Sequence, residues 1–429
     1  MNIADLLIGY GIRDISRRYL SFRDSPADLC LPDPDKTRRY LLYLHIPFCV
    51  VLCPFCSFHR VEFKRDRAES YFEALRQEIR MATGAGYRFS ELYVGGGTPT
   101  VLPDELIDTV RLVRNLHPVL RISAETNPDD LDDDKLPQLH DVGVNRLSVG
   151  VQSFDNDLLK EMQRYEKYGS GEQIRRRLQR VRGIFETLNV DMIFNFPHQT
   201  EESLRHDLNI LTNEVMADQV SFYPLMTANS ARKTMLRNLG AVDYRREKPM
   251  YQQIVRHMTA AGYRRSSAWC FSRESGMIDE YITEQDEYLG LGSGAFSFLN
   301  RSIYASTFSI NHYLRLVRQG QTGIVRHRHL SRLDEMRYYF LMRFFSGSFD
   351  LDAADSHFDG EFRRAMRMEL TSLRLFGAFN ASGSQLQLTE RGFYLWVMMM
   401  REFFTGVNNL RDEMRHNIAK ETRILPGGS

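Results

Sequence analysis

The sequence contains little cysteine, almost no charge imbalance and no long hydrophobic run. Its 429 residues include five cysteines, too few for the disulfide framework of a small secreted domain. The formal net charge of +1 provides no general field that attracts nucleic acid, and no basic run is interleaved with aromatic residues. No stretch approaches the ~20 consecutive apolar residues of a membrane span. We therefore expect neither a nucleic-acid partner nor a membrane span.

The N-terminus also lacks the marks of a secretion signal. Residues 1–10 carry Asp5 but no lysine or arginine, and no small-residue cleavage site follows. We therefore expect a cytoplasmic protein.

In a reducing compartment, clustered cysteines indicate a metal site more often than a disulfide. Hydrophobic residues make up 43% of the chain, which is enough for a sizeable core.

Strand and helix patterns alternate through the first half of the chain. Apolar strand patterns occur at residues 40–46, 91–94, 121–125, 146–149, 190–194 and 219–223. Helical patterns separate them, including residues 66–82, 103–115, 171–187 and 201–215. Strand–helix units of this length predict a parallel sheet with right-handed crossovers. Because six units fall short of the eight in a closed barrel, the sequence predicts an α/β fold with a partial (β/α)6 barrel.

The composition along the chain suggests further segments around this barrel. We expect a helical N-terminal extension, the barrel, a connector with a small mixed region that completes the barrel side, a mostly helical and winged-helix-like C-terminal domain, and a disordered tail. Their expected bounds are residues 1–35, 36–226, 227–330, 331–424 and 425–429. The glycine-rich stretch 288–295 is expected to be a flexible turn.

Three of the five cysteines lie in one loop after the first predicted strand. Cys49, Cys53 and Cys56 have CX3CX2C spacing, so three thiolates can hold three corners of a [4Fe–4S] cube and leave one iron open. The open iron needs a small chelating ligand, and the methionine end of S-adenosylmethionine offers an amine and a carboxylate. A structural zinc site with His59 as fourth ligand is the alternative, as are three incidental thiols.

The string YLHIPFC…CPFC resembles the radical S-adenosylmethionine superfamily, and within it the oxygen-independent coproporphyrinogen III oxidase-like branch. The resemblance is strong over residues 40–225 and weak over 288–295 and 386–392. It implies that the three cysteines are the catalytic cluster ligands and that one or two S-adenosylmethionine molecules bind. It also implies reductive cleavage of the sulfonium to a 5′-deoxyadenosyl radical.

The same resemblance assigns a cofactor site at the ends of successive strands. Its members are Tyr43, Phe55, Gly96, Gly97, Thr98, Glu125, Gln152, Arg164 and Asp191. It implies that the glycine run meets the methionine amine and Arg164 the methionine carboxylate. Gln152 and Asp191 would bind the ribose, Phe55 the adenine, and Tyr43 would order the methionine and the cluster. Alone, each is more simply a turn or a surface group; their order on consecutive strands favours the cofactor site.

Three positions depart from the relatives that the motif resembles. Phe58 stands where the coproporphyrinogen III dehydrogenases carry a further cysteine, and Asn195 replaces a glycine of the fifth-strand loop. Phe296 follows Gly294-Ala295 where the heme-chaperone branch has a histidine. We therefore expect a distinct subfamily, not the decarboxylase itself.

The expected function is a radical enzyme of the oxidoreductase or methyltransferase class. Its substrate would be a tetrapyrrole, heme or another large apolar molecule, changed by oxidative decarboxylation, methyl transfer or ring modification. A reducing protein such as flavodoxin or ferredoxin would supply electrons. The alternative is a heme-binding chaperone that retains the cluster without turnover.

Three features outside the motif remain open. Cys270 is either a packing residue or a hydrogen-donating thiol. The apolar run 393–404 is either a buried helix or a soft wall for a large flat substrate. His327 and His329 lie either in a solvated basic loop or against substrate carboxylates or an iron porphyrin.

Overall fold

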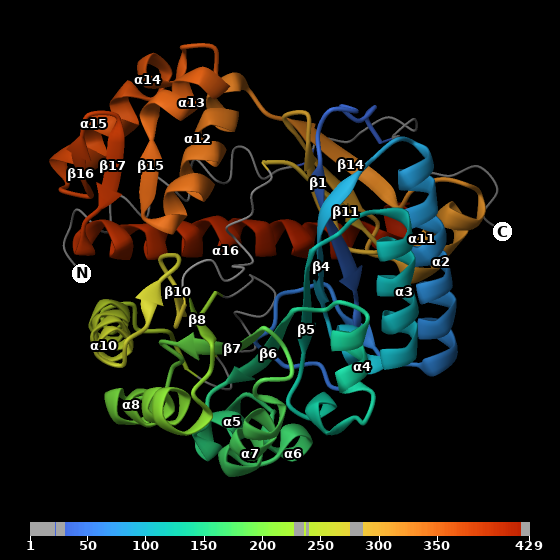
Figure 1. Cartoon of the computed structure of the whole chain (residues 1–429), viewed down its shortest axis with the longest axis horizontal. Helices are drawn as coiled ribbons and strands as arrows, with labels where there is room; N and C mark the ends of the chain where they lie inside the picture. The colour runs from blue at the N-terminus through green and yellow to red at the C-terminus, as the bar shows by residue number, and fades with distance from the viewer. Residues whose placement is uncertain (1–21, 23–30, 227–235, 237–239, 275–285, 422–429) are drawn as a thin grey trace.

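The structure is a computed structural model that describes Phe22, Leu236 and residues 31–226, 240–274 and 286–421. The predicted extension 1–35 lies largely outside these residues, and the predicted tail 425–429 lies entirely outside them. Figure 1 shows the described elements, coloured along the chain.

A large, mainly parallel sheet organises residues 40–329. Among the described residues it has twelve strands in the order β14-β13-β12-β11-β1-β4-β5-β6-β7-β8-β10-β9. The parallel strands are β1 (Tyr40–Ile46), β4 (Phe89–Gly96), β5 (Arg121–Thr126), β6 (Arg146–Gln152), β7 (Thr187–Phe194), β8 (Gln219–Pro224) and β11 (Tyr288–Leu291). The first six match the six predicted strands in order, which confirms the α/β fold class.

β11 corrects the first half of the stretch 288–295, which was expected to be a flexible turn throughout. It pairs in parallel with β1, from Leu41 opposite Tyr288 to Leu44 opposite Leu291. Gly290 serves close packing, because a Cβ on it would lie 2.0 Å from the carbonyl oxygen of Phe296. A turn does follow β11, and its glycines Gly292 and Gly294 have φ of +97° and +86°. The antiparallel strands at the two ends of the sheet are β12 (Phe296–Leu299), β13 (Ser302–Ser306), β14 (Ile324–His329), β10 (Cys270–Ser272) and β9 (Arg264–Arg265).

Helices cover the outside of the parallel strands, as Figure 1 shows. They are α2 (Arg65–Gly84), α3 (Pro103–Leu116), α4 (Leu136–Asp141), α5 (Asn156–Glu161), α6 (Tyr165–Tyr168), α7 (Gly171–Val181), α8 (Glu201–Asn209), α10 (Glu247–Ala260) and α11 (Ile310–Arg318). Short helical turns are η1 (Pro99–Val101) and η2 (Asp130–Asp132). The apolar faces of these helices pack on the sheet, as the spacing of buried residues in α2 illustrates.

Two helix predictions need correction at their ends. The helix predicted over 171–187 ends at Val181, because Gly183 has a φ of +81° that a helix cannot continue through. The helix predicted over 201–215 is α8 followed by the π-helical turn η3 (Ile210–Val215). Met216 ends that turn in the left-handed conformation, with a φ of +52°.

The C-terminal part is mostly helical, as predicted. It comprises α12 (Arg332–Arg343), η4 (Phe344–Ser346), α13 (Leu351–His357), α14 (Phe362–Ala365), α15 (Arg367–Leu375), α16 (Glu390–Glu421) and a small sheet of β15 (Ser348–Asp350), β17 (Gln385–Leu388) and β16 (Phe379–Ser382). The Thr389 hydroxyl oxygen accepts a hydrogen bond from the Gly392 amide at 3.0 Å, which caps the start of α16. Figure 1 shows α16 crossing the molecule between this part and the barrel strands.

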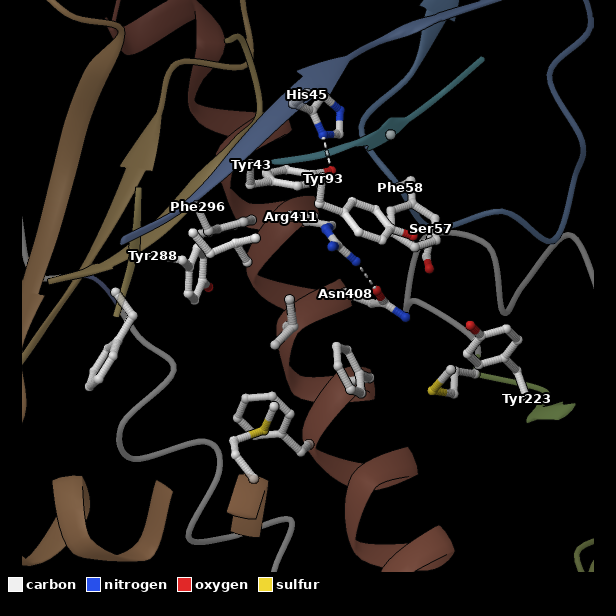
Figure 2. A pocket seen from close by; sticks show the side chains of 18 of the residues that line it. Tyr43, His45, Ser57, Phe58, Tyr93, Tyr223, Tyr288, Phe296, Asn408 and Arg411 are labelled. Carbon is white, nitrogen blue, oxygen red and sulfur yellow. Dashed lines mark hydrogen bonds between the residues drawn. The ribbon is translucent and has the colours of Figure 1, made fainter. Parts of the chain in front are cut away.

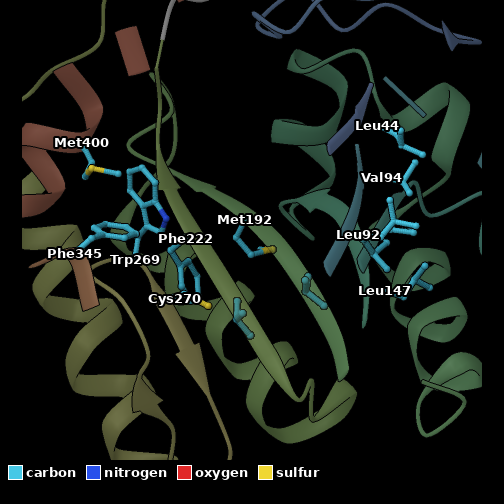
Figure 3. Close-up of a cluster of buried hydrophobic side chains, with 14 of the residues drawn as sticks. Leu44, Leu92, Val94, Leu147, Met192, Phe222, Trp269, Cys270, Phe345 and Met400 are labelled. Atoms are coloured by element: carbon cyan, nitrogen blue, oxygen red, sulfur yellow. The ribbon is translucent and has the colours of Figure 1, made fainter. Parts of the chain in front are cut away.

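The buried core joins the barrel to the C-terminal part. Figure 3 shows Trp269, Phe345 and Met400 in contact beside β8 and β10, with a Trp269–Phe345 centroid distance of 4.9 Å. Cys270 lies in the same core and is 1% exposed. This burial supports the packing role for Cys270. Among the described helices, none is long and apolar enough to cross a membrane.

Candidate functional site

A cavity of about 970 Å³ lies at the carboxyl ends of the parallel strands and is closed on the other side by α12 and α16. All the predicted site residues except Thr98 line it: Tyr43, Cys49, Cys53, Phe55, Cys56, Gly96, Gly97, Glu125, Gln152, Arg164 and Asp191. The strand order thus brings together residues that are up to 148 positions apart, from Tyr43 to Asp191. This is the end of a β/α barrel at which ligands bind.

The cysteine loop leaves β1 and is tied down at its start and end. Short parallel strands β2 (Phe48–Cys49) and β3 (Val61–Glu62) pair with each other. Within the loop the Cys56 amide donates to the Cys53 carbonyl oxygen at 3.2 Å, and the Arg60 guanidinium donates to the same carbonyl. Cys49 and Cys53 are buried, whereas Cys56 is half-buried. All three cysteines therefore occupy an ordered loop at the cavity wall.

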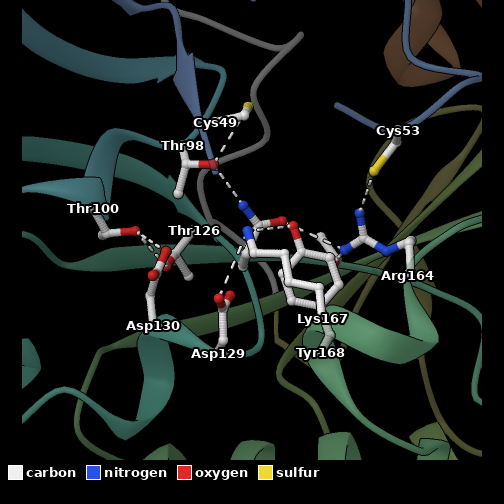
Figure 4. Close-up of polar contacts among 12 residues, drawn as sticks. Cys49, Cys53, Thr98, Thr100, Thr126, Asp129, Asp130, Arg164, Lys167 and Tyr168 are labelled. Atoms are coloured by element: carbon white, nitrogen blue, oxygen red, sulfur yellow. Dashed lines mark hydrogen bonds and ion pairs between the residues drawn. The ribbon is translucent and has the colours of Figure 1, made fainter. Parts of the chain in front are cut away.

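A chain of hydrogen bonds connects Cys49 to Cys53 behind the loop (Figure 4). The Thr98 hydroxyl donates to Cys49 Sγ at 3.5 Å and accepts from Asn127 Nδ2 at 2.7 Å. Arg164 then donates to Asn127 Oδ1 and to Cys53 Sγ, at 3.4 Å each. Thr98 does not line the cavity, so its geometry favours a role in positioning Cys49 over a direct contact with a ligand.

Each of the three thiols has an arginine nearby. Arg164 contacts Cys53, the charge of Arg60 acts on Cys49, and Arg415 and Cys56 interact electrostatically. Burial nevertheless raises the pKa of Cys49 to about 11. An iron–sulfur cluster on three thiolates is anionic, so three flanking cations favour it. The donor set and its charges therefore fit a [4Fe–4S] cluster.

The glycine run after β4 lies against the cysteine loop with no room for side chains. A Cβ on Gly97 would lie 2.7 Å from the Phe48 carbonyl oxygen and 3.0 Å from Cys49 Sγ. A Cβ on Gly95 would lie 2.8 Å from Glu125 Oε1. Gly96 has a φ of +119°, which an L side chain rarely adopts. These glycines are explained by the close approach of their backbone to the cysteine loop and to Glu125.

Glu125 anchors the backbone of this run. Its carboxylate accepts from the Gly96 amide at 2.9 Å and from the Tyr93 hydroxyl at 2.8 Å. Tyr43 lies beside Tyr93, and its hydroxyl is 2.8 Å from His45 Nδ1. Burial lowers the pKa of His45 to about 4, so this imidazole is neutral near pH 7. Tyr43, His45, Tyr93 and Glu125 all line the cavity.

The two residues predicted to bind ribose lie on neighbouring strands. Gln152 ends β6 with a φ of +77°, next to a register irregularity between Gly150 and Gln152. A glutamine in the left-handed region is uncommon and is typical of functional sites. Asp191 on β7 accepts from the Ser148 hydroxyl and from Asn189 Nδ2, at 2.8 Å each. Both side chains line the cavity, as the cofactor hypothesis requires.

The zinc alternative depends on His59, which the structure places elsewhere. Its ring packs on Phe308 at a centroid distance of 4.5 Å, and its Nε2 lies 3.3 Å from Ser293 Oγ. Across the residues that the structure describes, no group of three or more His, Cys, Asp or Glu side chains is arranged to hold a single metal ion. His59 therefore contributes to the buried core beside the cysteine loop.

Comparison with known proteins agrees with this geometry. Residues 43–211 match the family model described as the Radical SAM superfamily. The heme chaperone HemW of Bacillus subtilis is 30% identical over 64% of this chain and 75% of its own length. The chain belongs to the radical SAM superfamily, in the group of HemN-type coproporphyrinogen III oxidases and HemW.

Two further comparisons extend beyond the barrel. The oxygen-independent coproporphyrinogen III oxidase of Escherichia coli is 28% identical over 83% of each chain. The solved structure of coproporphyrinogen III oxidase (HemN) from Escherichia coli superposes with a TM-score of 0.72, at 23% identity, over 92% of this chain and 93% of that one. The resemblance inferred from the cysteine motif is thereby confirmed. Membership of the superfamily implies a [4Fe–4S] cluster and S-adenosylmethionine as cofactors.

Several site residues escaped the sequence analysis. Asn127 lies two positions after Glu125, and the rule that strand ends carry ligands would have included it. Tyr93 lies inside a strand and is recognisable only through its contact with Glu125. Arg60 and Arg415 contact loop carbonyls, and nothing in the spacing of Arg415 from the cysteines indicates this contact.

The remaining open features now have positions. The run 393–404 forms the buried start of α16, and its last residues, Phe403 and Phe404, line the cavity. Most of the run is therefore a buried helix, and the substrate-wall alternative stays a prediction for the two residues at the cavity. His327 and His329 lie on strand β14 rather than in a loop, where His327 stacks on Tyr304 and His329 Nδ1 lies 3.0 Å from Ser302 Oγ.

Proposed function

We propose that this protein is a radical SAM enzyme that holds a [4Fe–4S] cluster on Cys49, Cys53 and Cys56 and acts on a tetrapyrrole. When bound, the cluster and one or two S-adenosylmethionine molecules supply a 5′-deoxyadenosyl radical for hydrogen abstraction. The observation that carries the proposal is the convergence of the three cysteines, Gln152 and Asp191 on one cavity. Oxidative decarboxylation, methyl transfer and ring modification are the reaction classes that this radical can start.

This chain's own residues would bind and orient the cofactors. Arg164 lies beside Cys53 with its guanidinium buried, so it is placed to pair with the methionine carboxylate. Gln152 and Asp191 are placed to take the ribose hydroxyls. Phe55 packs edge-on against Phe196 at a centroid distance of 6.2 Å, which fixes its ring for stacking on adenine. A reducing protein such as flavodoxin or ferredoxin would deliver the electron.

The rest of the cavity favours a large, flat and partly apolar substrate. Figure 2 shows Tyr288, Phe296, Phe58 and Tyr223 around the space between the cysteine loop and α16. Farther out, the lining continues with Phe298, Tyr338, Tyr339, Phe403 and Phe404. Aromatic walls bind flat conjugated rings by stacking and by burial of apolar area. The names of the relatives, a coproporphyrinogen III oxidase and a heme chaperone, support a tetrapyrrole.

The direct test is cleavage of S-adenosylmethionine under anaerobic conditions. We expect the reconstituted full-length protein to form 5′-deoxyadenosine with dithionite, and Cys53→Ala to abolish the product, because the cluster loses one of three ligands. Cys270→Ala is the matched control and should retain activity, since Cys270 lies in the core outside the cavity. A wild-type protein that carries the cluster but forms no 5′-deoxyadenosine would contradict the proposal.

Heme binding without turnover is the second candidate, favoured by the 30% identity to the heme chaperone HemW. The position at which the chaperone branch has histidine is Phe296 here, and this ring lines the cavity. A phenylalanine offers no nitrogen to an iron porphyrin. Tight heme binding together with negligible 5′-deoxyadenosine formation would favour this candidate over the enzyme.

A further inference from the structure

The C-terminal end of α16 directly contacts the cysteine loop, which under the proposed function is the cluster loop. Arg415 Nη2 donates to the carbonyl oxygens of Ser57 at 2.8 Å and Phe58 at 2.7 Å. These are the two residues that follow Cys56, the third cysteine of the motif. The contact joins positions that are 358 and 357 residues apart. Two backbone carbonyls beyond a cluster ligand are thus held by one side chain of a distant helix.

The Arg415 side chain is itself held in place. Its Nη1 donates to Asp412 Oδ1 at 2.6 Å, one turn earlier on α16. Burial, the largest influence, lowers the pKa of Arg415, yet an arginine stays charged throughout the physiological range. Arg415 therefore presents a fixed positive charge on the Cys56 side of the loop.

A second arginine, one turn before Arg415, packs on the same loop. The Arg411 guanidinium lies 4.6 Å from the centroid of the Phe58 ring and 5.9 Å from that of Phe296. Arg411 also donates to Asn408 Oδ1 at 2.7 Å, as Figure 2 shows. The same stretch of α16 lines the cavity with Phe404, Val407 and Arg411. One helix therefore contacts both the cluster loop and the cavity that would receive substrate.

We propose that the C-terminal turns of α16 hold the cluster loop in place. Arg415 is then a positioning residue, which fixes the backbone after Cys56 and places a positive charge beside the cluster. This inference rests on the proposed function, because it requires that the three cysteines hold a cluster. Groups that orient metal ligands from behind contribute strongly to metal retention. A nearby cation also favours the reduced, more negative cluster, and so raises its reduction potential.

The experiment compares full-length wild type, Arg415→Gln, Arg415→Lys and Arg391→Gln after anaerobic reconstitution. The measurements are iron content, the rate of iron loss to a chelator, and the midpoint potential from an EPR-monitored titration. We expect Arg415→Gln to lose iron about tenfold faster and to have a more negative potential. Arg415→Lys keeps the charge but not the planar fork, so its potential should stay near that of wild type while iron loss accelerates. Arg391, exposed at the opposite end of α16, should have no effect.

A double variant guards against simple misfolding. Arg415→Gln leaves the Asp412 carboxylate buried without this partner. The double variant Arg415→Gln with Asp412→Asn therefore also removes the negative charge of Asp412. Circular dichroism melting of the metal-free proteins reports the fold separately. If the melting temperature falls while iron retention and potential match wild type, the role is structural and the inference is overturned. A wild-type protein that takes up no cluster would overturn the proposed function, and this inference with it.

Discussion

Among single residues, Gly97 shows how steric space controls the site. Its backbone lies so close to Phe48 and Cys49 that an added methyl group would overlap with both. We expect Gly97→Ala to displace the cysteine loop, to lower iron content after reconstitution and to cost about 1–3 kcal/mol of unfolding free energy. Gly84→Ala is the control, because no atom lies within 4 Å of its Cβ position at the end of α2. That change should stabilise by up to about 1 kcal/mol. Equal iron content in both variants would contradict this account.

Asp207 carries a pH dependence that the sequence does not indicate. Its carboxylate on α8 accepts from the Phe154 amide at 2.7 Å and from the Ser153 hydroxyl at 2.8 Å, just after Gln152. Burial raises the pKa of Asp207 to about 7, although the two hydrogen bonds act to lower it. The folded state therefore holds a proton that the unfolded chain releases near pH 4, and this contribution to stability is lost as pH rises towards 7.

The corresponding prediction concerns the slope of stability against pH. Between pH 5 and pH 8, the unfolding free energy of wild type should fall by up to about 3 kcal/mol more than that of Asp207→Asn. Asparagine keeps an acceptor for the Phe154 amide but cannot ionise. Urea unfolding at several pH values measures both slopes. Parallel slopes would show that Asp207 titrates alike in the folded and unfolded states.

At the scale of elements, a buried ion pair joins α10 to α16. Arg401 donates to both carboxylate oxygens of Glu247 and to Glu402 at 3.0 Å, and the side chains of Arg401 and Glu247 are 7% and 1% exposed. We expect Arg401→Met to cost about 3–5 kcal/mol in urea unfolding, because it leaves the Glu247 carboxylate buried without its cationic partner. Adding Glu247→Gln should recover part of that loss. Arg364→Met, at a surface pair with 83% side-chain exposure, should change stability by less than about 0.5 kcal/mol.

At the scale of the whole molecule, the cavity exists only because the C-terminal part closes over the barrel. Phe404 on α16 lies in its wall, at a centroid distance of 5.3 Å from Phe403. We expect Phe404→Ala to weaken binding of coproporphyrinogen III or heme by about tenfold, through lost apolar contact. Substrate-free cleavage of S-adenosylmethionine should be unchanged, because Phe404 lies outside the predicted cofactor residues. Leu120→Ala, at an exposed position, is the control, and equal affinities in a binding titration would contradict the expectation.

The positions of the strands and the cysteine motif could be predicted because both are local properties of the sequence. The alternation of apolar stretches predicts the bounds of β1, and of β4 through β8, to within a few residues. Three cysteines within eight positions must share one loop. β11 was missed because Gly290, followed by Gly292 and Gly294, indicates a turn, and only the packed neighbour Phe296 explains a glycine inside the strand. The overlong helix prediction after Gly171 failed for a related reason, since only backbone geometry reveals how Gly183 ends the helix.

The sequence alone therefore predicted six strands in their order along the chain, the cysteine motif and the polar residues at the strand ends, because each depends on neighbours in the chain. Only the tertiary structure decided that Thr98 lies behind Cys49, that His59 packs into the core and that Arg415 contacts the loop from 357 residues away. Such contacts form between segments that are distant in the chain and are set by how the helices pack on the sheet. Spacing along one sequence carries no record of that packing.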